Sequence, residues 1–407
     1  MYPSEQKQSR RIAEAVTAKN ENQQWEDFIV AMLAKLELPR EKQAQVKLRY
    51  EALGRHVARK LGIGEHDAHV VVQGSMRTQT TISGDAREKF DLDVVVKLSG
   101  PRFIGIRDSE PFFQQFGKAL EGVEAAGEPR AMNRCWRLQY PGEPFYFDVT
   151  PAIPSSQEIT GTDLRVRDPK TVWSPSNPEE FADWFCDIAV QQFPFQERAE
   201  QRRLVEAKTK VDPIPQGHVG IDDILRRTVQ LIKLHRDNYY RGMSDEKKAL
   251  KPISVILVTL ATQAYEKMVE TQPNAFSSAI EVALEVVDQM PTFINRGREV
   301  RVDNPALPGV RGENFADKWN SDGGLRDAAF KQWHGRLKLD LAALFEEDYS
   351  RKTELRVKNI FGDLGVTAWK DSLPKTPVMA GLLNTLPATA RSNPSAPINT
   401  GSRDQLA

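Results

Sequence analysis

The sequence contains few of the residues that build disulfide frameworks and zinc sites. Its 407 residues include two cysteines, Cys135 and Cys186, and six histidines without HxH or HxxxH spacing. Two thiols so far apart predict neither a disulfide scaffold nor a zinc ribbon. We therefore expect a reduced, cytoplasmic protein.

The sequence also lacks a charge excess and a membrane-length apolar run. Its 56 basic residues are balanced by 56 acidic ones, which argues against a surface that grips long DNA or RNA. The longest apolar stretch, 253–264, is shorter than the ~20 residues that span a bilayer, and it contains Ser254 and two threonines. The first residues carry no apolar signal core. We expect no membrane contact and no long nucleic-acid partner.

The hydrophobic periodicity changes along the chain. Apolar residues recur at helical spacing up to about residue 62, short β-branched strands alternate with loops as far as about 175, and mostly helical patterns follow. The residues from 384 onward are rich in Ser, Pro, Asn and Thr. The predicted domains are N-terminal helices with a long spine helix (1–65), a catalytic core (66–175), a helical lobe that closes a cleft (176–383) and a flexible tail (384–407).

Two aspartates lie two residues apart in a strand that is otherwise apolar. Phe90-Asp-Leu-Asp-Val-Val-Val-Lys-Leu98 places Asp91 and Asp93 on one face, because side chains alternate across a strand. Neighbouring carboxylates repel each other unless a cation lies between them, and Mg²⁺ prefers oxygen ligands. The DxD strand is therefore a candidate metal platform.

A later strand, within a hairpin predicted over 135–149, carries Asp148 between Phe147 and Val149. If it lies beside the DxD strand, three carboxylates converge, and three carboxylates suit two Mg²⁺ ions ~3.5–4 Å apart. A third element, Gln73-Gly74-Ser75, reads as a turn after the strand 69–73. Its backbone N–H groups and hydroxyl are suited to phosphate.

The ordered set GSMRTQTTI, FDLDVVVKL and FYFDVTP resembles the polymerase-β-like nucleotidyltransferase superfamily. Within it, the sequence is most similar to the CD-NTases of CBASS antiphage systems, which are relatives of animal cyclic GMP–AMP synthase. The segments WSPSNPEEFADWF, LRRTVQLIKLHRDNYY, KPISVILVTLATQAYE and NP…ENFADKW extend the resemblance into the helical half. It implies an α+β fold with a mixed sheet, a spine helix and a C-terminal helical-bundle lobe.

The resemblance also implies roles for individual residues. Asp91, Asp93 and Asp148 would be catalytic ligands of two Mg²⁺ ions, with Mn²⁺ as a substitute. Gln73, Gly74 and Ser75 would bind the donor nucleotide. Two residues of the helical lobe, Lys233 and Ser254, would contact its triphosphate from the opposite side.

The activity implied is two-metal phosphoryl transfer that joins ATP and other NTPs into a cyclic di- or trinucleotide messenger, with adenine in a trinucleotide favoured. An operon-encoded regulator, or a ubiquitin-transfer-like enzyme acting on the tail that ends Arg403-Asp-Gln-Leu-Ala407, is the expected partner. Three alternatives stay open: an enzyme that extends RNA ends, an inactive scaffold, and a nucleotide-binding module without turnover.

Overall fold

The computed structural model describes residues 22–83, 89–155, 162–195, 223–309, 312–345 and 353–373. The predicted tail, 384–407, lies outside these residues.

A first helix over residues 22–34 buries Trp25, Phe28 and Met32. The spine helix α2 (Arg40–Leu61) begins after Pro39 and ends at Gly62, which adopts a left-handed φ of 65°. The end of α2 agrees with the helical spacing predicted up to about residue 62.

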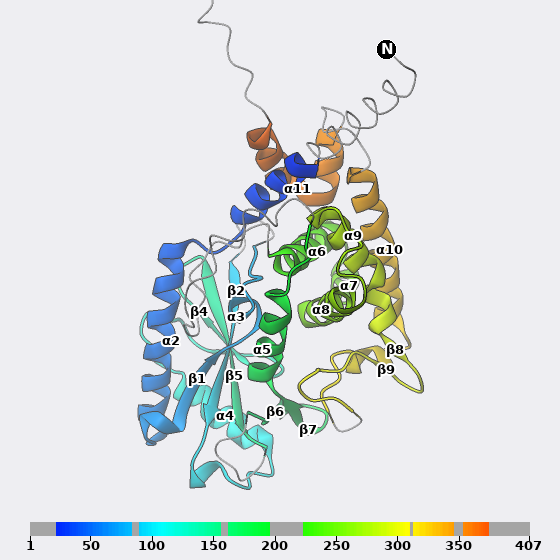
Figure 1. The fold of residues 1–407 in the computed structure, drawn as a ribbon. Helices are drawn as coiled ribbons and strands as arrows, with labels where there is room; N and C mark the ends of the chain where they lie inside the picture. Colours follow the sequence, from blue (N-terminus) through cyan, green and yellow to red (C-terminus); the bar gives the residue numbers. More distant parts are fainter. Residues whose placement is uncertain are drawn as a thin grey trace, which may run out of the picture. The chain divides into compact units, whose positions relative to one another are not determined.

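A mixed sheet forms the centre of the first half of the chain (Figure 1). Its main path runs β1 (Ala68–Val72), β2 (Phe90–Leu98), β5 (Phe145–Pro154), β4 (Trp136–Gln139) and β3 (Arg130–Ala131). The β2–β5 pair is parallel and the other pairs are antiparallel. Two further strands, β6 (Leu164–Asp168) and β7 (Val172–Ser176), extend the sheet from the end of β5. These two strands were not predicted from the sequence.

The two faces of the sheet differ in what they contact. Alternating side chains of β2, among them Leu92, Val94 and Val96, join the core formed with α2 and with α4 (Ser109–Ala119). Asp91 and Asp93 lie on the opposite face of the same strand. One face therefore anchors the sheet, and the other carries the carboxylates.

Helices dominate the second half of the chain (Figure 1). They are α5 (Pro178–Ala189), α6 (Ile224–Arg241), α7 (Asp245–Lys248), α8 (Ser254–Thr271), α9 (Ala279–Gln289), α10 (Leu325–Phe345) and α11 (Thr353–Ser372), which kinks at Gly362. Short elements complete the described chain: η1 (Glu65–Asp67), η2 (Pro101–Phe103), η4 (Met290–Phe293), η5 (Asp317–Asn320), β8 (Asn295–Arg296) and β9 (Val300–Arg301). None of the described helices is both long and apolar enough to cross a membrane.

The start of α5 follows its sequence signal. Asn177 accepts a hydrogen bond from the backbone N–H of Glu180, and Pro178 occupies the first helical turn. The turn predicted at Gly74 and Ser75 was wrong. These two residues instead begin the short helix α3 (Gly74–Arg77). The α+β class, the mixed sheet and the helical second half are confirmed.

Candidate active site

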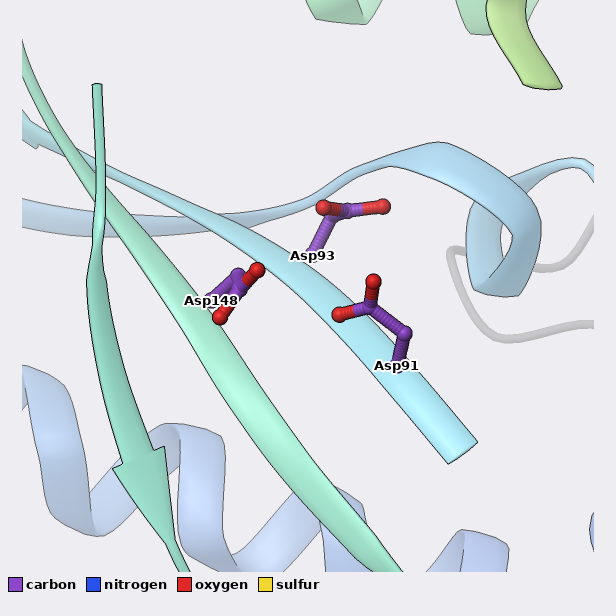
Figure 2. A group of neighbouring side chains, drawn as sticks. All are labelled: Asp91, Asp93 and Asp148. Atoms are coloured by element: carbon purple, nitrogen blue, oxygen red, sulfur yellow. The ribbon is translucent and has the colours of Figure 1, made fainter. Parts of the chain in front are cut away.

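Three carboxylates meet on the face of the sheet opposite α2 and α4 (Figure 2). Asp93 and Asp148 are register partners across the parallel β2–β5 pair, and Asp91 precedes Asp93 by two residues. One oxygen from each of the three lies within 4.8 Å of the other two. The predicted convergence of Asp91, Asp93 and Asp148 is therefore observed.

The carboxylates of β2 hold their protons unusually tightly. Burial in the cleft raises the pKa of Asp93 to about 8, and the charges of Asp91 and Asp148 add to the effect. Burial and the charge of Asp148 likewise raise the pKa of Asp91 to about 6. A divalent cation would remove this repulsion, because it favours the ionised form of every carboxylate that it touches. The donor set, three hard oxygen ligands close together, fits Mg²⁺ or Mn²⁺.

Arg137 compensates part of this negative charge. It lies opposite Asp148 in the β4–β5 pair, and its Nε and Nη2 donate to the two carboxylate oxygens at 2.8 and 2.7 Å. Its guanidinium also lies over the ring of Tyr146, 4.1 Å from the centroid. Tyr146 in turn hydrogen-bonds with Asp91. Arg137 therefore holds Asp148 in a bidentate geometry that fixes its orientation.

Gly74 packs directly against the carboxylates. It has a left-handed φ of 62°, and a Cβ at this position would lie 2.5 Å from Oδ2 of Asp93. The next residue, Ser75, accepts a hydrogen bond from the hydroxyl of Thr81 at 3.1 Å. Glycine is required here because any side chain would displace Asp93.

The cleft beside the carboxylates has a volume of about 840 Å³. Asp91, Asp93, Gly74 and Ser75 line it from the sheet side, and residues of α6 and α8 line it from the helical side. Gln73 is not among the lining residues. Instead it precedes α3, and its backbone N–H donates to the carbonyl of Asp93.

Both residues expected from the helical lobe line this cleft. Lys233 is buried, and its Nζ donates to the carbonyl of Thr80 at 2.7 Å, which links α6 to the segment after α3. Burial, assisted by Arg236, lowers the pKa of Lys233 to about 8. The second residue, Ser254, begins α8. The structure thus places Lys233 and Ser254 across the cleft from the carboxylates.

Several lining cations were not predicted. They are Lys89, Arg236, Arg241, Lys248 and Lys251. The balanced composition hides them, because a net charge averages over the whole surface. A local signal was present, since Arg236 follows Lys233 by three residues and so shares its helix face. The cleft joins carboxylates that suit metal ions to cations that suit phosphate.

A central mixed sheet with three converging carboxylates, faced across a cleft by the cations of α6, is the arrangement of the polymerase-β-like nucleotidyltransferase fold. Residues 23–188 match the family model described as the Second Messenger Oligonucleotide or Dinucleotide Synthetase domain, SMODS. This part of the chain is therefore similar to the SMODS family, in agreement with the resemblance to the CD-NTases.

Solved structures show the same fold. The CD-NTase CdnG of Bradyrhizobium diazoefficiens, solved in complex with GTP, is 22% identical with a TM-score of 0.63, covering 84% of this chain and 97% of that one. DncV cyclic AMP-GMP synthase of Vibrio cholerae, in complex with nonhydrolyzable GTP, is 14% identical with a TM-score of 0.50, covering 90% and 93%. A comparison with curated proteins found no match. At these identities the structural likeness establishes the fold.

Proposed function

We propose that this protein synthesises a cyclic oligonucleotide from ribonucleoside triphosphates and releases pyrophosphate. The observation that carries the proposal is the cleft itself, in which Asp91 and Asp93, with Asp148 beside them, face Lys233 and Ser254. Metal-binding carboxylates opposite phosphate-binding donors are what the transfer of a nucleotidyl group requires. The SMODS domain supports the same activity.

Each residue of the site has a separate role in nucleotidyl transfer. Asp91 and Asp93 would hold both metal ions, and Asp148 would complete the site where the attacking ribose hydroxyl is activated. Bound Mg²⁺ would lower the pKa of that hydroxyl and neutralise charge on the leaving pyrophosphate. Gly74 leaves room for Asp93 beside the backbone, and Ser75, which lines the cleft, would contact the donor phosphates. Lys233 and Ser254 hold the triphosphate tail in line with the attack.

The substrates we propose are ATP and a further NTP, and the product is an adenine-containing cyclic trinucleotide. The proposal for adenine rests on the resemblance of the WSPSNP and KPIS segments to one group of CD-NTases. We place the enzyme in cytoplasmic antiphage signalling, with an operon-encoded regulator or a ubiquitin-transfer-like enzyme as partner.

The test uses the purified chain with Mg²⁺ and all four labelled NTPs, followed by phosphatase. We expect a phosphatase-resistant product that Asp91→Ala/Asp93→Ala does not make, and mass spectrometry then gives its bases and ring size. Product formation only when RNA is added would instead establish an RNA-end-extending enzyme. Nucleotide binding without pyrophosphate release would establish a module without turnover.

A further inference from the structure

Arg236 is a buried guanidinium that joins α6 to the start of α8. Its side chain is 6% exposed, and its Nε and Nη2 donate to the carboxylate of the adjacent Asp237. Its Nη1 donates to the carbonyl of Pro252 at 3.1 Å and to Oγ of Ser254 at 3.0 Å. One side chain therefore fixes both the entry of the chain into α8 and the first residue of that helix.

The contact with Arg236 sets the direction in which the Ser254 hydroxyl donates. A guanidinium has donors but no acceptor, so the serine oxygen must accept and its proton stays available. Other hydroxyls of α8 are used differently: Thr259 and Thr262 donate to carbonyls four residues earlier. Ser254 is the first residue of the helix, so no earlier helical turn offers it such a carbonyl. Because Ser254 lines the cleft, its O–H is left to donate there.

The surrounding charges favour an anion at the same place. Asp237 also lines the cleft, and its carboxylate is paired with Arg236 and with Nζ of Lys251 at 3.0 Å. These two cations hold the pKa of Asp237 below its ordinary value although burial acts in the opposite sense. The start of α8 has no side-chain cap, which adds the positive end of the helix dipole.

We propose that Arg236 is a positioning residue that orients the Ser254 hydroxyl as a donor to the triphosphate. The inference rests on the proposed function, in which Ser254 contacts that group. Arg236 acts through Ser254. Its guanidinium donates to the serine oxygen, so that the hydroxyl proton points toward the phosphate oxygens. The ligand class is a polyphosphate, independent of the base attached to it.

Binding of inorganic tripolyphosphate with Mg²⁺, measured by calorimetry, tests the inference without turnover or base choice. Ser254→Ala and Arg236→Lys should each weaken binding by about tenfold, the scale of one hydrogen bond to a charged group. The double variant should bind no more weakly than the single ones, because both changes remove the same contact. Thr262→Val, an isosteric change on α8 away from the cleft, serves as the control and should leave the affinity unchanged.

The role of Arg236 would be overturned if the two single losses of affinity multiply in the double variant. It would also be overturned if Arg236→Lys binds tripolyphosphate with unchanged affinity. An unchanged affinity for Ser254→Ala would overturn both that role and the triphosphate contact in the proposed function. If circular dichroism shows that Arg236→Lys is unfolded, Arg236→Met/Asp237→Asn replaces it, since removing both charges leaves neither member of the Arg236–Asp237 pair buried without the other. Adding Ser254→Ala to this replacement is then expected to weaken the binding of tripolyphosphate no further.

Discussion

Gly74 shows how closely one backbone position controls the carboxylates. Gly74→Ala adds a left-handed penalty of about 1–3 kcal/mol and a methyl group 2.5 Å from Asp93 Oδ2. We expect lower thermal stability and a loss of at least about tenfold in kcat, because displacement of a ligand by about 1 Å is costly.

Gly142→Ala is the matched control for this change. Gly142 has a φ of 80° in the turn between β4 and β5, and its added Cβ would meet nothing within 4 Å. It should lose similar stability and keep its kcat. Equal loss of kcat in the two variants would mean that backbone strain, rather than contact with Asp93, decides the effect.

The raised carboxylate pKa values predict a stability effect of defined sign. Asp93 binds its proton more tightly in the folded protein than in the unfolded chain. The free energy of unfolding therefore falls as the pH rises from about 4 to about 8. Asp93→Asn should therefore raise the melting temperature in EDTA at pH 8.5, by an amount that corresponds to about 1 kcal/mol. The gain should vanish near pH 4. A destabilised Asp93→Asn at pH 8.5 would contradict the raised pKa of Asp93, which burial and the neighbouring carboxylates cause together.

At the residue scale, the sequence was sufficient to place Asp91 and Asp93 on one face, because side chains alternate along a strand. The sequence placed Asp148 beside them only on the condition that its strand neighbours theirs, which the β2–β5 pairing meets. It did not identify Arg137, whose role depends on the register between β4 and β5. Register is a property of two strands, and no spacing within one of them reports it.

At the scale of elements, α6 holds the segment after α3 in place. Nε of Arg226 donates to the carbonyl of Thr78 at 2.9 Å, and Lys233 donates to that of Thr80. Gln79 between them has a left-handed φ of 55°. Two donors from one helix therefore constrain the segment that follows Ser75.

Lys233→Met should remove both this link and a charge from the triphosphate site. We expect KM for the NTPs to rise by about 10–100-fold, the scale of a charge-assisted contact. In the unmodified protein KM should also rise as the pH passes about 8, where Lys233 loses its proton. Steady-state kinetics from pH 7 to 9.5 check both effects. Lys47→Met, on the exposed side of α2, is the control and should leave KM unchanged.

Long amphipathic elements were predictable, whereas three of the short elements were not. The stripe of α2 and the apolar face of β2 each repeat several times within the element. The five-residue strands β6 and β7 and the four-residue helix α3 offer too few repeats to establish a period. Their form depends on tertiary contacts, such as the pairing of β6 with the end of β5.

At the scale of the whole molecule, the balanced charge bears on activation. With 56 basic and 56 acidic residues, the net charge of the protein does not favour the binding of long DNA or RNA. Product formation should therefore be unchanged, within about twofold, when duplex DNA or RNA is added at 150 mM salt. A rate that rises steeply with nucleic-acid concentration would show that a local basic surface outweighs the overall balance.

The central claim is that Asp91, Asp93 and Asp148 hold the ions that carry out nucleotidyl transfer. Anomalous diffraction from crystals grown with Mn²⁺ and a nonhydrolysable NTP tests it most directly. We expect two manganese peaks about 3.5–4 Å apart, bounded by these three carboxylates, with the triphosphate reaching toward Lys233 and Ser254. Manganese bound elsewhere, or a triphosphate in the cleft with no ion at the three aspartates, would contradict the claim.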